Sequence, residues 1–341
     1  MMNRKLSAAI IGAGRIAGGY DTDKIGSDAG VYTHAGAYTR DERFVLRTIC
    51  DLDASQAESF RKQWNIGSAT SHPEEIYTDY HDVISVCTPD TAHFEVIRNI
   101  LEHGACRTIF AEKPLAPTRD EIAHLRRLAD ERGVNLVVDY QRRFDKCHER
   151  VRDLISQGRP GLLAVNAFYM KGLEHNGVAL IDTLTYLCGP PDEVLAYNRV
   201  FNSMAEEYSY DFILFYERFN TTVRTIDTEP SEYHYHIFEV DLLFSDRRVT
   251  INDNSRTLEQ RMAGEYAYSG VKALDDKNPL REDTGYRFAL PAAVDYIYEI
   301  TANNKAHDRN TPESSLIDRA ILDAIPLSYE NKTKVPMGVT V

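Results

Sequence analysis

Gly12, Gly14 and Ala17 follow a short apolar run near the start of the chain, in the spacing G-x-G-x-x-A. The first glycine permits a tight turn, the second lets the backbone approach a phosphate, and the small third residue lets a helix pack against a strand. Backbone N–H groups at the start of the following helix, around Arg15 and Ile16, would face the phosphates. The motif therefore predicts dinucleotide binding, and a chance glycine-rich turn is the alternative.

Asp51 ends the second apolar run, where its carboxylate can accept hydrogen bonds from both hydroxyls of an adenosine ribose. It follows Gly14 by more than the usual distance of about 20 residues, and a polar, glycine-rich insertion at residues 18–32 accounts for the excess. Leu52 follows, so no arginine is ready for a 2′-phosphate. Asp51 therefore favours NAD over NADP, unless it only caps the next helix.

The first third of the chain alternates short apolar runs with amphipathic stretches, which predicts βαβ units and a doubly wound parallel sheet. The expected strands are Leu6–Ile11, Phe44–Cys50, 83–87, 108–111 and 136–138, and the expected helices are 33–40, 54–64, 91–102 and 119–131. Right-handed crossovers place the carboxyl ends of all these strands on one edge, where ligands bind.

After about residue 140 the pattern changes to one typical of an α/β domain with an antiparallel sheet. We expect strands at Leu162–Tyr169, 212–216, 221–226, 233–243 and 249–251, helices at 151–157, 180–187 and 313–329, and an irregular excursion at 265–286. Pro326 should end or kink the last helix. The prediction is a dinucleotide-binding domain at 1–140 and a substrate-binding and oligomerisation domain at 141–341, with 313–341 packing back towards the first domain.

Composition excludes several classes of function. The 341 residues carry a formal charge of −13, which argues against a nucleic-acid binder and against docking on an anionic membrane. The five cysteines are widely spaced and never form a CxxC pair, as expected for reduced thiols in a cytoplasmic protein. The first apolar run is too short for a signal peptide or a membrane span. His234 and His236 alternate on an expected strand without further ligands, so no metal site is predicted.

Three further motifs follow the glycine turn: Thr88-Pro89-x-x-x-His93, Glu112-Lys113-Pro114, and D-xxxx-L-x-G from Asp182 to Gly189. In this order they resemble the glucose–fructose oxidoreductase, inositol dehydrogenase and rhizopine catabolism (Gfo/Idh/MocA) family. Segments at 18–21, 33–35 and 140–145 resemble one subgroup of it.

The resemblance implies an N-terminal Rossmann domain and a C-terminal α/β domain with a large, open, mostly antiparallel sheet. It further implies a nicotinamide cofactor, a sugar, cyclitol or sugar-nucleotide substrate, and a homodimer or homotetramer formed through the open sheet face. Thr88, Pro89 and His93 are then expected near the cofactor, although such a histidine also often caps or packs.

Lys113 lies just past an expected strand end and is followed by Pro114, so it can face both the nicotinamide and a substrate hydroxyl. There it could steer or share a proton, which is the role the family gives to the matching lysine. Glu112 would orient Lys113 or pack on the cofactor ribose. The alternative is an ordinary exposed lysine.

The chain departs from the family at the usual base. The family pattern D-x-G-x-H-x-x-D places a histidine three residues before Asp182, but Ala179 stands there, and a methyl group cannot take a proton. Three readings follow: Lys113 handles the proton, with His175 or Tyr140; or the reaction needs only Lys113 as an acid; or the protein binds cofactor and sugar without turnover.

Four further residues could contact the substrate, and each of them could instead have a structural role. Asp182 would contact a hydroxyl or serve as a helix-interior acid, and Asn176 would donate to a sugar hydroxyl or form a turn. Arg142 and Arg143 would bind a carboxylate or phosphate, or form a domain-bridging ion pair. The sequence thus predicts an NAD(P)-dependent oxidoreductase of a sugar-like substrate; the alternative is a redox-silent binding or regulatory protein on the same scaffold.

Overall fold

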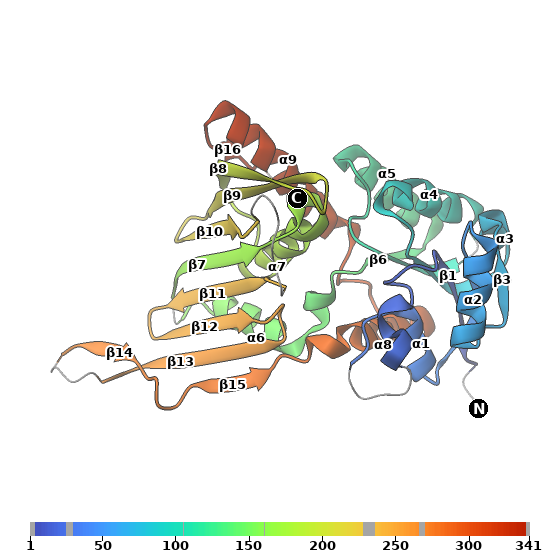
Figure 1. Ribbon diagram of the computed structural model, residues 1–341, viewed down its shortest axis with the longest axis horizontal. Coiled ribbons are helices and arrows are strands. Elements are labelled where there is room, and N and C mark those ends of the chain that lie inside the picture. Colours follow the sequence, from blue (N-terminus) through green and yellow to red (C-terminus); the bar gives the residue numbers. More distant parts are fainter. Residues whose placement is uncertain are drawn as a thin grey trace. The chain divides into compact units, whose positions relative to one another are not determined.

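The computed structural model describes residues 4–24, 30–104, 106–159, 161–227, 236–265 and 270–338. The chain divides into two compact units (Figure 1). The first comprises Met1–Phe144 and Arg287–Leu316, and the second comprises Asp145–Tyr286 and Ile317–Val341. The division therefore differs from the expected one, which had a boundary at residue 140 and residues 313–341 packing back towards the first domain. Residues 287–316 return to the first unit, whereas Ile317–Val341 belongs to the second.

The first unit contains a six-stranded parallel sheet in the order β3-β2-β1-β4-β5-β6, which confirms the predicted doubly wound fold. Its strands are β1 (Leu6–Ile11), β2 (Phe44–Cys50), β3 (Ser68–Thr70), β4 (His81–Val86), β5 (Cys106–Ala111) and β6 (Asn135–Val138). Its helices are α1 (His34–Arg40), α2 (Ala54–Trp64), α3 (Pro73–Thr78), α4 (His93–His103), α5 (Arg119–Arg132) and α8 (Ala289–Ala302). In Figure 1, α4 and α5 lie on one side of the sheet and α1 and α8 on the other.

The central strands β1 and β4 are buried at every residue. Helices on both faces exclude water from both sides of these strands, so β1 and residues 83–87 read as largely apolar runs rather than as alternating ones. This is why their positions could be predicted. The three-residue β3 at the sheet edge has no such run, and it was not predicted.

Helix α8 was also not predicted. Its residues Leu290, Val294 and Ile297 are fully buried in one core cluster with Tyr38 of α1 and Phe44 of β2. The segment contains Pro291, but proline is tolerated in the first turn of a helix. Helix α8 therefore completes the core on the side of the sheet that α1 also covers.

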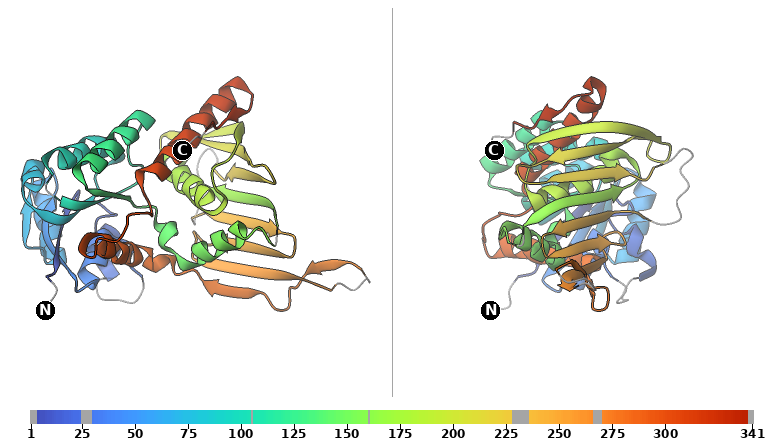
Figure 2. Two further views of the ribbon diagram at one scale, coloured as in Figure 1. Left: turned by 180° about the vertical axis from the view of Figure 1, so that it is seen from behind. Right: turned by 90° about the vertical axis from the view of Figure 1, so that its left-hand side faces the viewer.

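The second unit is built on a ten-stranded sheet, which confirms the expected mostly antiparallel sheet. Its strands are β7 (Leu162–Tyr169), β8 (Glu193–Asn202), β9 (Glu207–Phe215), β10 (Asn220–Thr225), β11 (Glu239–Phe244), β12 (Arg247–Asn252), β13 (Thr257–Glu265), β14 (Lys272–Leu274), β15 (Leu280–Asp283) and β16 (Val335–Pro336). Among the pairings described in this sheet, only β7 and β10 are parallel. Helices α6 (Lys146–Ser156) and α7 (Val178–Cys188) lie on one face of it (Figure 2).

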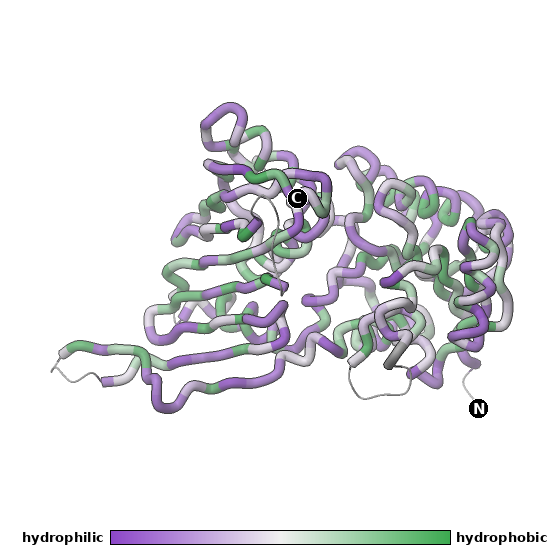
Figure 3. Tube along the Cα trace, in the orientation of Figure 1, coloured by the Kyte–Doolittle hydropathy of each residue, from purple (hydrophilic) through white to green (hydrophobic). Residues whose placement is uncertain are grey.

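Strand β11 alternates between buried and half-buried residues, as expected for a sheet covered on one face. Figure 3 shows polar and apolar residues interspersed along the strands of this sheet. The stretch expected to be irregular, 265–286, contains β14 and β15. The start of the strand expected at 233–243 lies outside the described residues, as does His234.

Helix α9 (Pro312–Asn331) continues through Pro326, so the expected end of the helix there is wrong. All five cysteines are free thiols, and four of them are buried. No helix in the described part of the chain is long and apolar enough to cross a membrane.

Candidate active site

The carboxyl ends of β1, β4, β5 and β6 meet at one edge of the first sheet. Just past the ends of three strands, a backbone N–H continues the ladder to the neighbouring strand. Cys87 N–H donates to Ile11 O, Glu112 N–H to Val86 O, and Asp139 N–H to Ala111 O, at 2.8, 3.0 and 2.8 Å. The glycine turn, Thr88-Pro89, Glu112-Lys113 and Tyr140 are thereby brought to one edge, as predicted.

The two motif glycines differ in their surroundings. Gly12 has φ +95°, and a Cβ atom there would lie 2.5 Å from Cys87 O, so only glycine fits beside the end of β4. A Cβ atom on Gly14 would meet nothing within 4 Å. This open space is where the backbone of a dinucleotide-binding turn is approached by a pyrophosphate, so the turn fits the predicted cofactor.

The expected helix does not begin at this turn. Gly18 and Gly19 donate to Gly14 O and Tyr20 donates to Arg15 O, which makes one helical turn followed by a 3₁₀ turn, Gly19–Lys24. The first α-helix, α1, starts only at His34. Arg15 and Ile16 thus offer N–H groups to an anion without the aligned dipoles of a long helix behind them.

The carboxylate of Asp51 accepts hydrogen bonds from two backbone N–H groups. One carboxylate oxygen accepts from Ala13 N–H at 2.8 Å, and the other accepts from Asp53 N–H at 3.0 Å. Asp51 therefore stabilises the glycine turn. The cap of α2 is Asp53, which accepts from Ser55 N–H and Gln56 N–H, so the alternative of Asp51 as that helix cap is wrong.

His93 links two of the motifs. Its Nδ1 lies 2.6 Å from Pro114 O and its Nε2 lies 2.9 Å from Thr88 O, and the residue is fully buried. The histidine of TPxxxH thus ties the turn after β4 to the segment after β5. The Thr88 hydroxyl oxygen is shielded from solvent and has no hydrogen-bond partner within the described structure.

Lys113 is half-buried, and the Lys113–Pro114 peptide bond is cis. Glu112 is 8% exposed, and its Oε2 accepts from Lys113 N–H at 3.3 Å. Burial would raise the pKa of Glu112, but the hydrogen bond from His34 and the charges of His34 and Lys113 lower it below its ordinary value. Glu112 is therefore a carboxylate fixed beside the lysine.

Tyr140, Arg142 and Arg143 follow β6, the latter two in a 3₁₀ turn, Gln141–Phe144. Tyr140 is 4% and Arg142 8% exposed, so both side chains are buried. The Tyr140 hydroxyl accepts from Ser315 Oγ at 3.4 Å, and the guanidinium of Arg143 lies 5.7 Å from the Tyr140 ring centre. Arg143 is half-buried, so its charge is more accessible to a substrate than that of buried Arg142.

In the second unit, His175 and Asn176 lie on a π-helix, Gly172–Gly177, that leads directly into α7. Such wide turns are rare and recur at functional sites. The helical chain does extend back past His175, but its π geometry changes the expected one-turn alignment with Ala179. His175 is exposed, whereas Asp182 is 1% exposed within α7.

Carboxylates that the sequence analysis missed hold this π-helix. Glu207 of β9 accepts from the N–H groups of Glu174 and His175, both at 2.8 Å. Arg319 of α9 pairs with both carboxylate oxygens of Glu174 at 2.7 Å. No local sequence signal marks these residues, because they lie far from the motif along the chain.

The first unit also contains a buried cluster that sequence patterns did not assign: His34, Glu112 and Asp139. Asp139 follows an expected strand end and His34 lies in one of the subgroup segments, so the position of each residue in the sequence could have drawn attention to it.

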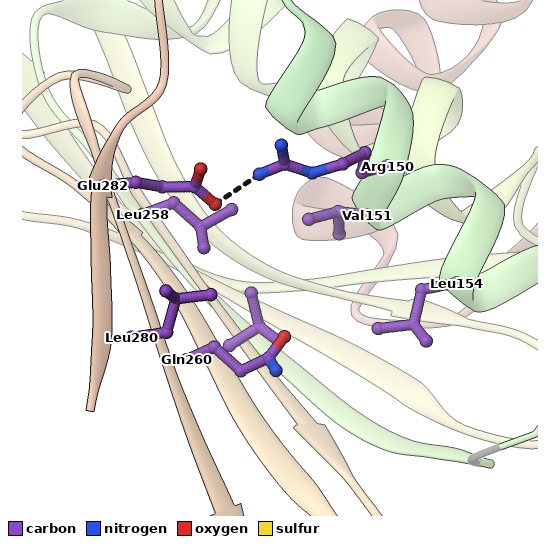
Figure 4. A pocket seen from close by; sticks show the side chains of 8 residues that line it. Arg150, Val151, Leu154, Leu258, Gln260, Leu280 and Glu282 are labelled. Atoms are coloured by element: carbon purple, nitrogen blue, oxygen red, sulfur yellow. Dashed lines mark hydrogen bonds and ion pairs between the residues drawn. The ribbon is translucent and has the colours of Figure 1, made fainter. Parts of the chain in front are cut away.

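Elsewhere, a hollow of about 220 Å³ lies in the second unit between α6 and the sheet, lined by Val151, Leu258 and neighbouring residues (Figure 4). It contains none of the predicted site residues.

Residues 6–140 match the family described as "Oxidoreductase family, NAD-binding Rossmann fold", Gfo/Idh/MocA. The protein carries the NAD-binding domain of this family. Among curated proteins, the chain is similar to D-glucoside 3-dehydrogenase of Escherichia coli, with 30% identity over 48% of this chain and 43% of that enzyme. The chain spans about half the length, or less, of the curated relatives it matches.

Among solved structures, two share the fold of this chain over nearly its whole length. Levoglucosan dehydrogenase in complex with NADH and levoglucosan has a TM-score of 0.80 and 15% identity, covering 98% of this chain and 100% of that one. The super-repressor mutant of Gal80p from Saccharomyces cerevisiae has a TM-score of 0.77 and 15% identity, covering 98% of each. At these identities the likeness concerns the fold.

The two glycines give a matched pair of variants. We expect Gly12→Ala to lower the free energy of unfolding by about 2 kcal/mol, because the residue is both strained and crowded. Gly14→Ala should leave stability unchanged yet weaken NADH at least about tenfold, because its methyl group would occupy the open space. Urea unfolding and NADH fluorescence measure both effects. Wild-type NADH affinity in Gly14→Ala would contradict the assigned phosphate approach.

Asp51→Asn tests cofactor choice. The amide can still accept from Ala13 N–H, but it carries no charge to repel a 2′-phosphate. We expect the preference for NADH over NADPH to fall by about tenfold or more, equivalent to about 1.4 kcal/mol. Fluorescence titration with both cofactors measures the ratio, with Asp53→Asn as the control that leaves it unchanged. An unaltered ratio in Asp51→Asn would remove Asp51 from cofactor selection.

Proposed function

We propose that the protein is an NAD-dependent oxidoreductase that transfers a hydride between nicotinamide and a carbon bearing a hydroxyl or carbonyl group of a sugar, cyclitol or sugar nucleotide. One observation carries the proposal: the glycine turn, Asp51 and the Glu112-Lys113 segment meet at one strand edge. The similarity to D-glucoside 3-dehydrogenase supports a sugar-like substrate. A cytoplasmic location and a homo-oligomer formed through the open sheet face belong to the same proposal.

Each residue group has a task in this reaction. Asp51 holds the adenosine ribose while Gly14 leaves room for the pyrophosphate. When bound, the cofactor supplies the hydride acceptor or donor. Lys113 donates a hydrogen bond to the substrate oxygen and gives or takes its proton, and Glu112 keeps the lysine segment in place. The π-helix offers His175 and Asn176 to sugar hydroxyls, and Arg143 offers a charge to an anionic substituent.

Lys113→Ala tests the role of the lysine. We expect turnover to fall by at least about 10²-fold, because one acid/base group is lost, while NADH affinity stays within about threefold of wild type. The assay follows absorbance at 340 nm with NAD⁺ or NADH against sugars, cyclitols, sugar nucleotides and their keto forms. The control is Lys62→Ala, an exposed lysine on α2. Turnover by Lys113→Ala at the wild-type rate would defeat the proposed role.

A second candidate is a redox-silent protein that binds cofactor and sugar. Ala179 at the usual position of the base favours it, and so does the shared fold with a super-repressor mutant of Gal80p. Ala179→His separates the two. If Lys113 is sufficient, we expect this variant to change turnover by less than about tenfold. Tight NADH binding without turnover in the wild type, together with turnover gained by Ala179→His, would establish the silent reading instead.

A further inference from the structure

A fully buried imidazole lies behind the Glu112-Lys113 segment. His34, the first residue of α1, has its Nε2 3.1 Å from Glu112 Oε1 and 3.6 Å from Asp139 Oδ2. Its Nδ1 lies 3.1 Å from Ser85 Oγ, and its ring centre lies 4.6 Å from that of Phe110. Neither the proposed reaction nor the family motifs give this side chain a task.

The surroundings of Nε2 determine which atoms carry hydrogen. The side chains of Glu112 and Asp139 are 10% and 0% exposed, so water cannot screen two carboxylates that face the same nitrogen. An unprotonated Nε2 would direct its lone pair at both of them. Nε2 must therefore donate, and a positive charge on the ring offsets part of the buried negative charge.

The second nitrogen is compatible with that charge. Ser85 Oγ can accept from Nδ1–H, and the Tyr38 hydroxyl, 2.9 Å from Ser85 Oγ, completes the chain of hydrogen bonds. Burial alone would lower the pKa of His34, but Cys87, Asp139 and Glu112 raise it well above its ordinary value. Burial also raises the pKa of the Cys87 thiol. The contacts of Nε2 with Glu112 and Asp139 are the geometric support for a charge on His34.

We propose that His34, as an imidazolium, is a positioning residue that bridges the carboxylates of Glu112 and Asp139 and thereby fixes the backbone that carries Lys113. The inference rests on the proposed role of Lys113.

Glu112 transmits the effect through its two oxygens. Oε1 is bound by His34, and Oε2 accepts from Lys113 N–H. His93 holds the next residue by its carbonyl, Pro114 O. Lys113 therefore lies between Glu112, which His34 contacts, and Pro114, whose carbonyl oxygen contacts His93. Without the positive charge on His34, the pair of carboxylates must take up a proton. The hydrogen bond from Lys113 N–H to Glu112 then weakens.

Nuclear magnetic resonance of the full chain tests the charge. In protein labelled with ¹⁵N-histidine, we expect both ring nitrogens of His34 to be protonated at pH 7.5, with the signal assigned by its absence in His34→Gln. His81 is the internal control, because burial lowers its pKa and should leave it neutral. One unprotonated nitrogen on His34 would overturn the proposal. So would a divalent ion that replaces the Nε2 proton, since the three side chains offer ligand atoms within 4.8 Å of one another.

Hydrogen exchange at the Lys113 amide tests the positioning without any substrate. We expect His34→Gln to speed this exchange by about tenfold and Glu112→Gln to do the same, since both weaken the same bond. The double variant should be no faster than either single one, while His81→Gln changes the rate less than about twofold. Additive effects, or a rate unchanged in His34→Gln, would show that His34 does not act through Glu112.

Kinetics separate this inference from the proposed function. With a substrate that turns over, His34→Gln should lower kcat by about tenfold at unchanged NADH affinity, and the double variant should match Glu112→Gln. If the wild type turns over no substrate, the proposed function fails; if Lys113→Ala retains wild-type turnover, the proposed role of Lys113 fails. If Lys113 is essential but His34→Gln has wild-type kcat, only the positioning role fails.

Since the pKa of His34 is raised, the stability that it contributes is complete below about pH 6.5, its ordinary value, and is lost as the pH rises through the folded value. The groups that face it are Glu112, Asp139, Cys87 and, through Ser85, Tyr38. The melting-temperature difference between wild type and His34→Gln should therefore narrow towards alkaline pH. A difference that widens there would contradict the imidazolium.

Discussion

The hydrogen bonds that continue the parallel ladder one residue past the strand ends are the constraint on which the rest of the site depends. They fix the residues that leave β4, β5 and β6 to the neighbouring strand before the chain turns away. Side chains separated by many residues in sequence are thereby held at a spacing set by the sheet and not by the loops. A loop alone would have to lose considerable conformational entropy to achieve the same arrangement. The buried sheet therefore determines how precisely the side chains at this edge are positioned.

Charge is arranged at this edge so that each buried ionic group has a partner. Asp51 accepts from backbone N–H groups, and Glu112 faces His34 on one side and Lys113 on the other. Among these carboxylates, the charge of Asp139 is the least well compensated, because burial and the charge of Glu112 raise its pKa to about 6. A half-compensated carboxylate of this kind is costly for stability, and proteins retain such costs mainly where function requires them.

Much of the first unit could be predicted because its signals are local. Strands β1 and β2 match their apolar runs, and the motif residues follow strand ends as expected. What could not be predicted depends on contacts distant in sequence: helix α8, which is recognisable only by the core it completes, and Glu207, which anchors the π-helix from another strand. The late start of the first helix at His34 agrees with the insertion inferred at residues 18–32, but the single helical turn directly after Gly14 could not be predicted, since the motif is the same whether a full helix or a single turn follows. The role of Asp53 as the cap of α2 was missed because Asp51, two residues earlier, offered the same chemistry.

The discontinuous first unit also affects how the protein is made. Residues up to Phe144 leave the ribosome early, but Leu290, Val294 and Ile297, which close their core, follow only after the whole segment Asp145–Tyr286 has been synthesised. At synthesis rates of about 5–20 residues per second, this delay is about 7–30 s. During that time the nascent sheet exposes the apolar surface that α8 later covers. The Rossmann unit is thus completed only after translation has passed through the other unit.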